Sequence, residues 1–246
     1  EYLSTKTNSA IFIHSRRGTV FPPFSHYWLK GNNQLRIYMR EHIEIQGFAE
    51  DYLTENIRQG DIVFITLRLP YYFGPDGLSS KENDFIYTDI NGEEITRYEF
   101  FQGWKLAVSQ FASILDSKGA DLVLSSPSPE WDAHNWVRCK SPQWFQALNT
   151  QECKYEREIF DDKYSSITMF LDDLKLRYNN VHVFDSLSVL CPNDTCHYLL
   201  DGKELYVDNN HLSNFAMRTA VGPSLYKLLD DLMTSKNNLN NNLSNY

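Results

Sequence analysis

The sequence lacks long apolar runs, basic clusters and a leader motif. No apolar run approaches the ~20 residues that a membrane-spanning helix requires. No succession of basic, apolar and small residues at the start has the pattern of a signal peptide. Lys and Arg are scattered apart from Arg16-Arg17, and the formal net charge is -9. A nucleic acid is therefore not expected as a partner, because binding to phosphates requires a basic surface.

The sequence has only four cysteines, and they lie in two pairs. Cys191 and Cys196 enclose a short polar turn, and Cys139 and Cys153 flank a second loop. This placement predicts two local disulfides, and therefore an oxidising compartment. A zinc site using these thiols or His197 is the first alternative, because a C-x4-C spacing occurs among zinc ligands. Four unlinked cysteines in a reducing cytosol are the second. We favour the disulfides because neither pair forms a C-x-x-C knuckle, and we expect no metal and no cofactor.

The pattern of apolar residues predicts an α/β fold. Short apolar runs predict buried strands at 9–14, 61–67, 122–124 and 181–185. Helical spacing predicts a helix in the later part of 34–58 and further helices at 98–117, 155–178 and 212–232. Alternating strands and helices predict a mostly parallel sheet with helices on both faces.

Two turn signals and the C-terminal composition complete this prediction. Asn91-Gly92 indicates a small hairpin, and Asp201-Gly202 indicates another within 191–207. The 246 residues suffice for one domain with a buried core. We expect a single domain over 1–233 without an internal boundary, followed by a disordered Asn-rich tail over 234–246. Because the first residue is Glu1 rather than Met, we expect the sequence to start inside a longer gene product.

The segment from Tyr206 to Ser213 holds an acid and an imidazole three residues apart, between a predicted short strand and a predicted helix. A carboxylate that orients a histidine fixes its tautomer and stabilises the imidazolium that forms when the ring takes a proton. Asp208 and His211 are therefore candidates for two members of a hydrolase triad. The alternative is that Asp208 or Asn210 caps the helix and His211 is an ordinary residue of its first turn.

Several polar and aromatic residues follow the predicted strands. Chemistry in parallel sheets gathers at the carboxyl ends of strands, where Arg68 to Tyr72, Ser125 to Trp131 and Asp185 to Leu187 lie. Arg68, Tyr71 and Trp131 lie in these segments and are our candidates for substrate binding. The two aromatic rings would suit the apolar faces of sugars. The alternative for the tryptophans 131, 136 and 144, and for Tyr71 with its aromatic neighbours, is that they cover the core. For Asp185 we favour a turn cap over a site role.

Motifs along nearly the whole chain resemble one family. Leu205-Tyr206-x-Asp208-x-x-His211-Leu212-Ser213, preceded by Leu190-Cys191-Pro192 and Cys196, resembles the C-terminal catalytic block of SGNH (GDSL-type) hydrolases. It most resembles the SGNH domain appended to membrane acyltransferase-3 proteins, which O-acylate cell-surface polysaccharides. Supporting segments are Arg17-Gly18-x-x-Phe21-Pro22-Pro23, Asp61-Ile-Val-Phe-Ile and Ser126-Pro127-x-Pro129-Glu130. The resemblance implies a three-layer α/β/α sandwich, here lacking its first strand, with Asp208 and His211 as catalytic acid and base.

The nucleophile of the family has no counterpart in this sequence. SGNH enzymes carry their serine in a Gly-Asp-Ser motif, whereas the only Gly-Asp here is Gly60-Asp61, followed by Ile62. Ser15, Ser125 and Ser126 follow predicted strands and are possible replacements. The favoured alternative is that their hydroxyls satisfy local backbone groups.

What the resemblance implies is an extracytoplasmic domain, in the bacterial periplasm or at the cell surface, tethered to an upstream membrane acyltransferase. The intact protein would take an acyl group, expected to be acetyl, from an acyl donor and pass it through a serine ester to a carbohydrate acceptor. We expect this sequence by itself to be inactive. A free-standing carbohydrate esterase and a non-catalytic carbohydrate-binding or scaffold module are the alternatives.

Overall fold

The computed structural model describes residues 26–29, 51, 53–73, 85–89, 91, 93–131, 139 and 153–243. The chain divides into two compact units. Unit 1 comprises Glu1–Ser125 and Ser165–Val183, and unit 2 comprises Ser126–Tyr164 and Phe184–Tyr246. The strand predicted at 9–14 lies outside the described residues.

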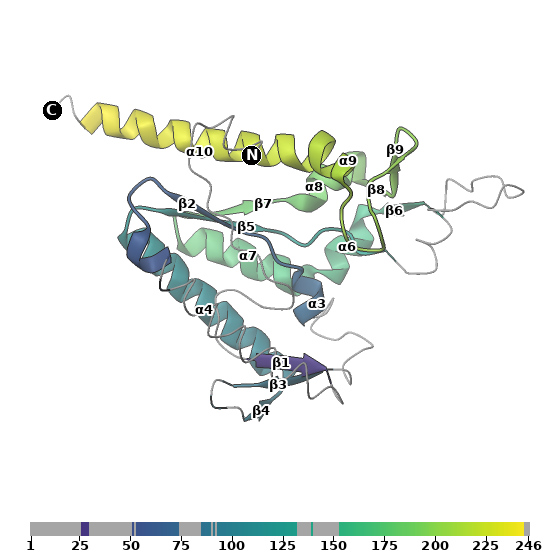
Figure 1. Ribbon diagram of the computed structural model, residues 1–246, viewed down its shortest axis with the longest axis horizontal. Coiled ribbons are helices and arrows are strands. Elements are labelled where there is room, and N and C mark those ends of the chain that lie inside the picture. The colour runs from purple at the N-terminus through teal and green to yellow at the C-terminus, as the bar shows by residue number, and fades with distance from the viewer. Residues whose placement is uncertain are drawn as a thin grey trace, which may run out of the picture. The chain divides into compact units, whose positions relative to one another are not determined.

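The central element of unit 1 is a three-stranded parallel sheet (Figure 1). Its strands are β2 (Ile62–Ile65), β5 (Asp121–Ser125) and β7 (Val181–Phe184), in the order β2-β5-β7. β2 and β5 run parallel, and Leu122 donates its N–H to the carbonyl of Asn180, which precedes β7, at 2.8 Å. Every residue of the middle strand β5 is buried, as expected for a parallel strand covered on both faces. The sequence prediction of a parallel sheet is confirmed.

Two long helices of unit 1, α4 (Arg97–Ser117) and α7 (Ser165–Arg177), lie on the same face of this sheet (Figure 1). Their aromatic residues meet those of α3 (Leu69–Phe73). The ring of Phe73 lies 4.7 Å from that of Phe101 and 4.9 Å from that of Trp104, and Trp104 lies 5.5 Å from Phe170, all between centroids. This aromatic cluster is buried and forms a large part of the hydrophobic core of unit 1.

Local sequence signals set the bounds of α4. Thr96 accepts the N–H of Glu99 at 3.1 Å, and the Glu99 carboxylate accepts the N–H of Thr96 at 2.8 Å, so that a capping box starts the helix. After the helix, Gly119 adopts a φ of +69°, which an L side chain rarely adopts. A Cβ at Gly119 would also come within 3.0 Å of Gln59 Cγ. Glycine therefore ends the helix and lets the chain turn directly into β5.

A second, antiparallel sheet of unit 1 contains the predicted hairpin. It consists of β1 (His26–Leu29), β3 (Phe85–Thr88) and β4 (Glu94–Ile95), in the order β1-β3-β4. Thr88 pairs with Glu94, and the Asp89 carboxylate accepts the N–H groups of Asn91 and Glu93 at 2.9 and 2.8 Å. The hairpin predicted from Asn91-Gly92 is thus confirmed.

Unit 2 is built from short elements. β6 (Lys154–Glu156) pairs antiparallel with β8 (Thr195–His197), and β9 (Leu199–Leu200) pairs with β10 (Lys203–Glu204) across the predicted turn Asp201-Gly202. The helices are α6 (Arg157–Lys163), α8 (Ser186–Leu190) and the 3₁₀ turn η1 (Pro192–Asp194). The single helix predicted over 155–178 is wrong, because a break at Tyr164 separates α6 from α7.

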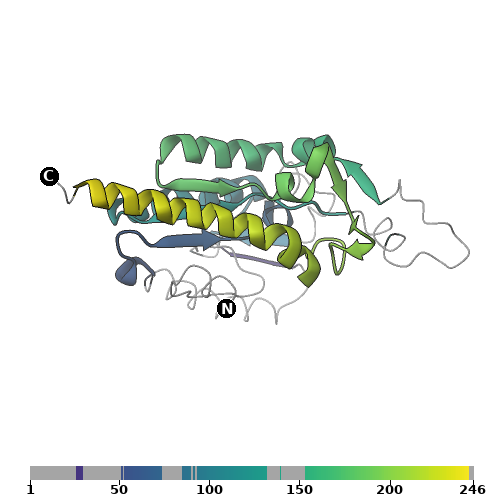
Figure 2. The ribbon, with the colours of Figure 1, turned by 90° about the horizontal axis from the view of Figure 1, so that it is seen from above.

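The C-terminal helical segment contains one irregular turn. α9 (Asn214–Ala216) leads into the π turn η2 (Met217–Val221) and then α10 (Gly222–Leu243), which Figure 2 shows as a long yellow helix. Pro223 has no backbone N–H, so it cannot donate the hydrogen bond that an α-helix would require at this position. The wider π turn just before Pro223 accommodates this missing donor. The predicted helix end at 232 is wrong, because α10 continues to Leu243.

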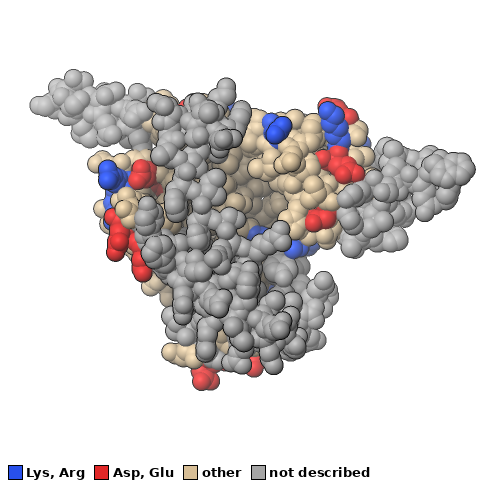
Figure 3. Space-filling model, viewed as in Figure 1, with Lys and Arg blue, Asp and Glu red and all other residues tan. Residues whose placement is uncertain are grey.

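Two surface properties of the described residues bear on function. None of the helices that the structure describes combines the length and the apolar composition needed to cross a membrane. On the face seen in Figure 3, the described Lys and Arg side chains are scattered among Asp and Glu. Among the described residues visible on that face, neither charge sign forms a large surface.

Candidate active site

The candidate acid and base lie in a closed turn of unit 2. An antiparallel bridge joins Tyr206 to Leu212, and the N–H of Val207 donates to the carbonyl of His211 at 2.9 Å. The N–H of Ser213 donates to the carbonyl of Leu205, also at 2.9 Å. These bonds close the segment Asp208–His211 into a hairpin-like turn whose two ends are fixed.

Within this turn the Asp208 carboxylate contacts both the backbone and the ring of His211. Oδ1 accepts the N–H groups of Asn210 at 2.9 Å and His211 at 2.7 Å, and Oδ2 lies 2.6 Å from His211 Nδ1. An ionised carboxylate can only accept, so Nδ1 carries the proton and Nε2 is left as the basic nitrogen. The expected contact between Asp208 and a ring nitrogen of His211 is confirmed.

The exposure of His211 suits a proton-transfer role. Its side chain is 67% exposed, so the ring does not pack into the core. In the part of the chain that the structure describes, no hydrogen bond joins Nε2 to a serine. The candidate base is therefore oriented through Nδ1 and, among the described residues, open at Nε2, which is the arrangement that a general base needs.

Two opposing effects act on the pKa of Asp208. Burial alone would raise the pKa of this carboxyl, but the backbone N–H groups of Asn210 and His211 and the ring of His211 together hold it below its ordinary value. The carboxylate is thus ionised throughout the neutral range. Because the folded-state pKa is lowered, these contacts stabilise the fold above the ordinary carboxyl pKa. This stabilisation is lost as the pH falls through the lowered value.

The helix after the turn is capped by a different residue. Ser213 Oγ accepts the N–H of Ala216 at 3.1 Å and donates to the carbonyl of Glu204 at 2.6 Å. Ser213 is therefore the N-cap of α9. The alternative in which Asp208 or Asn210 caps this helix is wrong, and the Asp208 carboxylate acts within its own turn and on the imidazole.

Ser213→Ala is expected to lower the free energy of unfolding by about 1–2 kcal/mol, because it removes the cap and leaves the N–H of Ala216 without its acceptor. Urea denaturation followed by circular dichroism measures this change. Ser235→Ala is the control, since Ser235 is exposed and its hydroxyl only donates to the Leu232 carbonyl within α10. Equal stability of the two variants would contradict the capping role.

A protein-family model matches most of the chain. The family model described as "SGNH domain (fused to AT3 domains)" matches residues 6–222. This chain belongs to that family. The SGNH domain is a three-layer α/β/α fold, in agreement with the predicted class and with the parallel sheet and helices of the structure. Neither a curated protein nor a solved structure gives a significant match to the chain.

Two of the three serines considered as an SGNH nucleophile lie among the described residues, and both are buried. Ser126 is buried, and its Oγ accepts the N–H of Ser186 at 2.9 Å, the backbone role that the sequence analysis favoured. Ser125 is a buried residue of β5. Ser15 lies outside the described residues.

The structure bears on each candidate substrate-binding residue separately. Trp131 is only 2% exposed, and its ring stacks on Tyr155 at 4.9 Å. A ring buried in this way cannot offer a face to a sugar, so the structure corrects the binding role and supports the alternative that Trp131 covers the core. Arg68 is half-buried after β2, and Tyr71 lies in α3 with its side chain outside the described residues. The tryptophans at 136 and 144 also lie outside them.

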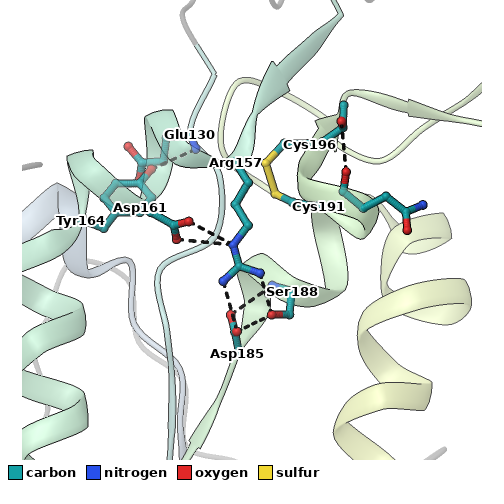
Figure 4. The surroundings of a disulfide bond; sticks show 10 residues. Glu130, Arg157, Asp161, Tyr164, Asp185, Ser188, Cys191 and Cys196 are labelled. Carbon is teal, nitrogen blue, oxygen red and sulfur yellow. Dashed lines mark hydrogen bonds and ion pairs between the residues drawn. A yellow bond between two sulfur atoms is a disulfide. The ribbon is translucent and has the colours of Figure 1, made fainter.

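Arg157 contacts three polar side chains, and the sequence analysis did not predict these contacts. Its guanidinium lies 3.2 Å from the Asp161 carboxylate and 3.5 Å from that of Asp185, and it donates to Ser188 Oγ at 2.8 Å (Figure 4). Asp185 caps α8 by accepting the N–H of Ser188 at 3.0 Å, as predicted. A lone arginine at a helix start gives no sequence signal for partners about 30 residues away.

Both predicted disulfides are present. Cys139 pairs with Cys153, and Cys191 pairs with Cys196. All four sulfurs are consumed, so no thiolate is left for the zinc site considered above. The first bond belongs to the hydrophobic cluster around Trp131, and the second joins Cys191, which directly follows α8, to Cys196 in β8 (Figure 4).

Proposed function

We propose that this chain is the SGNH part of an acyltransferase that O-acylates cell-surface polysaccharide, with acetyl as the expected acyl group. The observation that carries the proposal is the 2.6 Å contact between Asp208 Oδ2 and Nδ1 of an exposed His211 in a family member. Acyl transfer through a serine ester requires a base oriented by an acid. Asp208 and His211 supply these two groups.

In the proposed reaction a Gly-Asp-Ser serine attacks the carbonyl carbon of the acyl donor, and His211 Nε2 takes the hydroxyl proton. The leaving group of the donor departs with that proton, and the acyl group stays on the serine as an ester. A carbohydrate hydroxyl then attacks the ester while His211 removes its proton. The serine oxygen leaves and recovers the proton from the imidazolium. Asp208 holds the ring throughout and stays ionised.

The disulfides and the family also support a proposed location. Disulfides persist in oxidising compartments, and both bonds of this chain are formed. Fusion to AT3 domains is the feature that names the family. We therefore place the domain outside the cytoplasm, in the periplasm or at the cell surface, tethered to a membrane acyltransferase.

The test compares this chain with a form extended upstream to include a Gly-Asp-Ser segment. On an activated acetyl ester, this chain is expected to show no turnover that depends on His211, because a base without a nucleophile moves a proton but holds no acyl group. The extended form is expected to release acetate and, with an oligosaccharide present, to form its acetyl ester.

Each other outcome has a defined meaning. Turnover by this chain that His211→Ala abolishes would show that a serine within it is the nucleophile, with residues 15, 125 and 126 to be replaced first. Hydrolysis without transfer to the sugar by the extended form would indicate the esterase. An inactive extended form would indicate a non-catalytic module.

A further inference from the structure

The Asp208–His211 turn is tied to a residue far away in the sequence. The N–H of Trp131 donates to the carbonyl of Asn209 at 2.8 Å, and Asn209 Nδ2 donates back to the carbonyl of Trp131 at 3.4 Å. Asn210 Nδ2 in turn donates to Asn209 Oδ1 at 2.8 Å, which orients the amide of Asn209. Asn209 is therefore bound to Trp131 by both its backbone and its side chain.

Trp131 provides a rigid attachment point. Its ring centroid lies 4.9 Å from Tyr155, 5.6 Å from Tyr198 and 5.8 Å from Tyr206, and the Cys139–Cys153 disulfide belongs to the same cluster. The Tyr198 hydroxyl also donates to the carbonyl of Tyr206 at 3.1 Å. Buried, interlocked rings of this kind leave the Trp131 backbone little freedom to move.

The side chains of the catalytic pair are held by hydrogen bonds within the turn rather than by packing. The His211 side chain is 67% exposed and that of Asp208 is 39% exposed, so packing does not hold either one. The bridge Tyr206–Leu212 fixes the ends of the turn, whereas the bonds of Asn209 reach its middle. A displacement of about 1 Å in a catalytic group can cost about 100-fold in rate.

We propose that Asn209 is a positioning residue, which fixes the turn that carries Asp208 and His211 to the buried Trp131 and so sets the tautomer and direction of the imidazole. The importance of Asn209 for acyl transfer rests on the proposed function. The effect of Asn209 on the His211 ring is independent of that function. Asn209 contacts neither the imidazole nor an acyl group, and it acts through the position of the Asp208 carboxylate.

The test reads the tautomer of His211 in this chain by nuclear magnetic resonance of ¹⁵N-labelled histidine. The wild type is expected to show the Nδ1–H form with a downfield Nδ1–H proton, because Asp208 accepts that proton. Asn209→Ala is expected to give mixed tautomers and to lose or broaden the downfield signal. Asn209→Leu, which keeps the bulk of the side chain but offers no amide donor, is expected to do the same.

Two further variants separate positioning from stability. Asn214→Ala removes an exposed asparagine of α9 and is expected to leave the His211 signals unchanged. Trp131→Phe keeps an aromatic ring and both backbone atoms that bind Asn209, so it is expected to lower the melting temperature while preserving the Nδ1–H tautomer. In the extended enzyme, Asn209→Ala is expected to lower kcat by about 10- to 100-fold with KM unchanged.

The outcomes for this proposal and for the proposed function are distinct. Wild-type tautomer and Nδ1–H signal in folded Asn209→Ala and Asn209→Leu would overturn the positioning role, whatever the activity. Loss of the signal in these variants would support the positioning role. If the extended form also transferred no acyl group, that second result would contradict the proposed acyltransferase function and leave the positioning role supported.

Discussion

Asp208→Asn in the extended form with its Gly-Asp-Ser segment is expected to lower kcat by roughly 10⁴-fold and to leave KM nearly unchanged. An asparagine can turn its amide N–H toward Nδ1 of His211, where the carboxylate now accepts at 2.6 Å. Nδ1 would then become the acceptor and the ring proton would move to Nε2. A base protonated at Nε2 cannot take the serine proton, so the chemical step fails while substrate binding remains.

Two companion variants complete this experiment. His211→Ala removes the base and is expected to reduce transfer to background. Asp201→Asn is the matched control, because Asp201 is an exposed acid of the same unit whose φ of +50° an asparagine adopts readily. Rates of acetyl transfer at saturating and limiting substrate separate kcat from KM. An Asp208→Asn enzyme with kcat within a few-fold of the wild type would contradict the orienting role.

The sequence predicted the main elements of unit 1 because their signals are local. The apolar run at 61–67 indicates a buried strand, and Gly119 indicates the end of a helix. Neither signal requires knowledge of distant residues. The structure confirms both β2 and the end of α4. Helix bounds near the C-terminus were less accurate. The extension of α10 to Leu243 runs through an Asn-rich stretch that lacks a clear helical periodicity.

For the site, the sequence predicted the contact within one turn but not its attachments. Asp208 and His211 are three residues apart, so their contact follows from local geometry. The bonds from Asn209 to Trp131 join residues 78 positions apart, and no spacing rule reveals such a pair. Sequence alone also could not decide the role of Trp131. An aromatic residue that follows a strand suits both a sugar-binding site and a hydrophobic core, and only the tertiary packing distinguishes the two.

Removing the two disulfides separately is expected to destabilise unit 2 to different extents. The sulfurs of Cys139 and Cys153 close a loop with a sequence separation of 14, whereas Cys191 and Cys196 are separated by 5. A longer closed loop restricts the unfolded chain more. The double variant Cys139→Ala/Cys153→Ala is therefore expected to lose about 3 kcal/mol of unfolding free energy, and Cys191→Ala/Cys196→Ala about 2 kcal/mol.

The two variants are also expected to differ at His211, for a reason independent of loop length. The Cys139–Cys153 bond belongs to the cluster that buries Trp131, while the other bond joins Cys191, which directly follows α8, to Cys196 in β8. Loss of the first should loosen the attachment of Asn209 and broaden the Nδ1–H signal of His211, whereas loss of the second should leave that signal sharp. Urea denaturation and the histidine spectra, recorded on the same samples with reduced wild type as the reference, measure both effects. A sharp His211 signal in the Cys139→Ala/Cys153→Ala variant would show that the aromatic rings hold Trp131 without the disulfide.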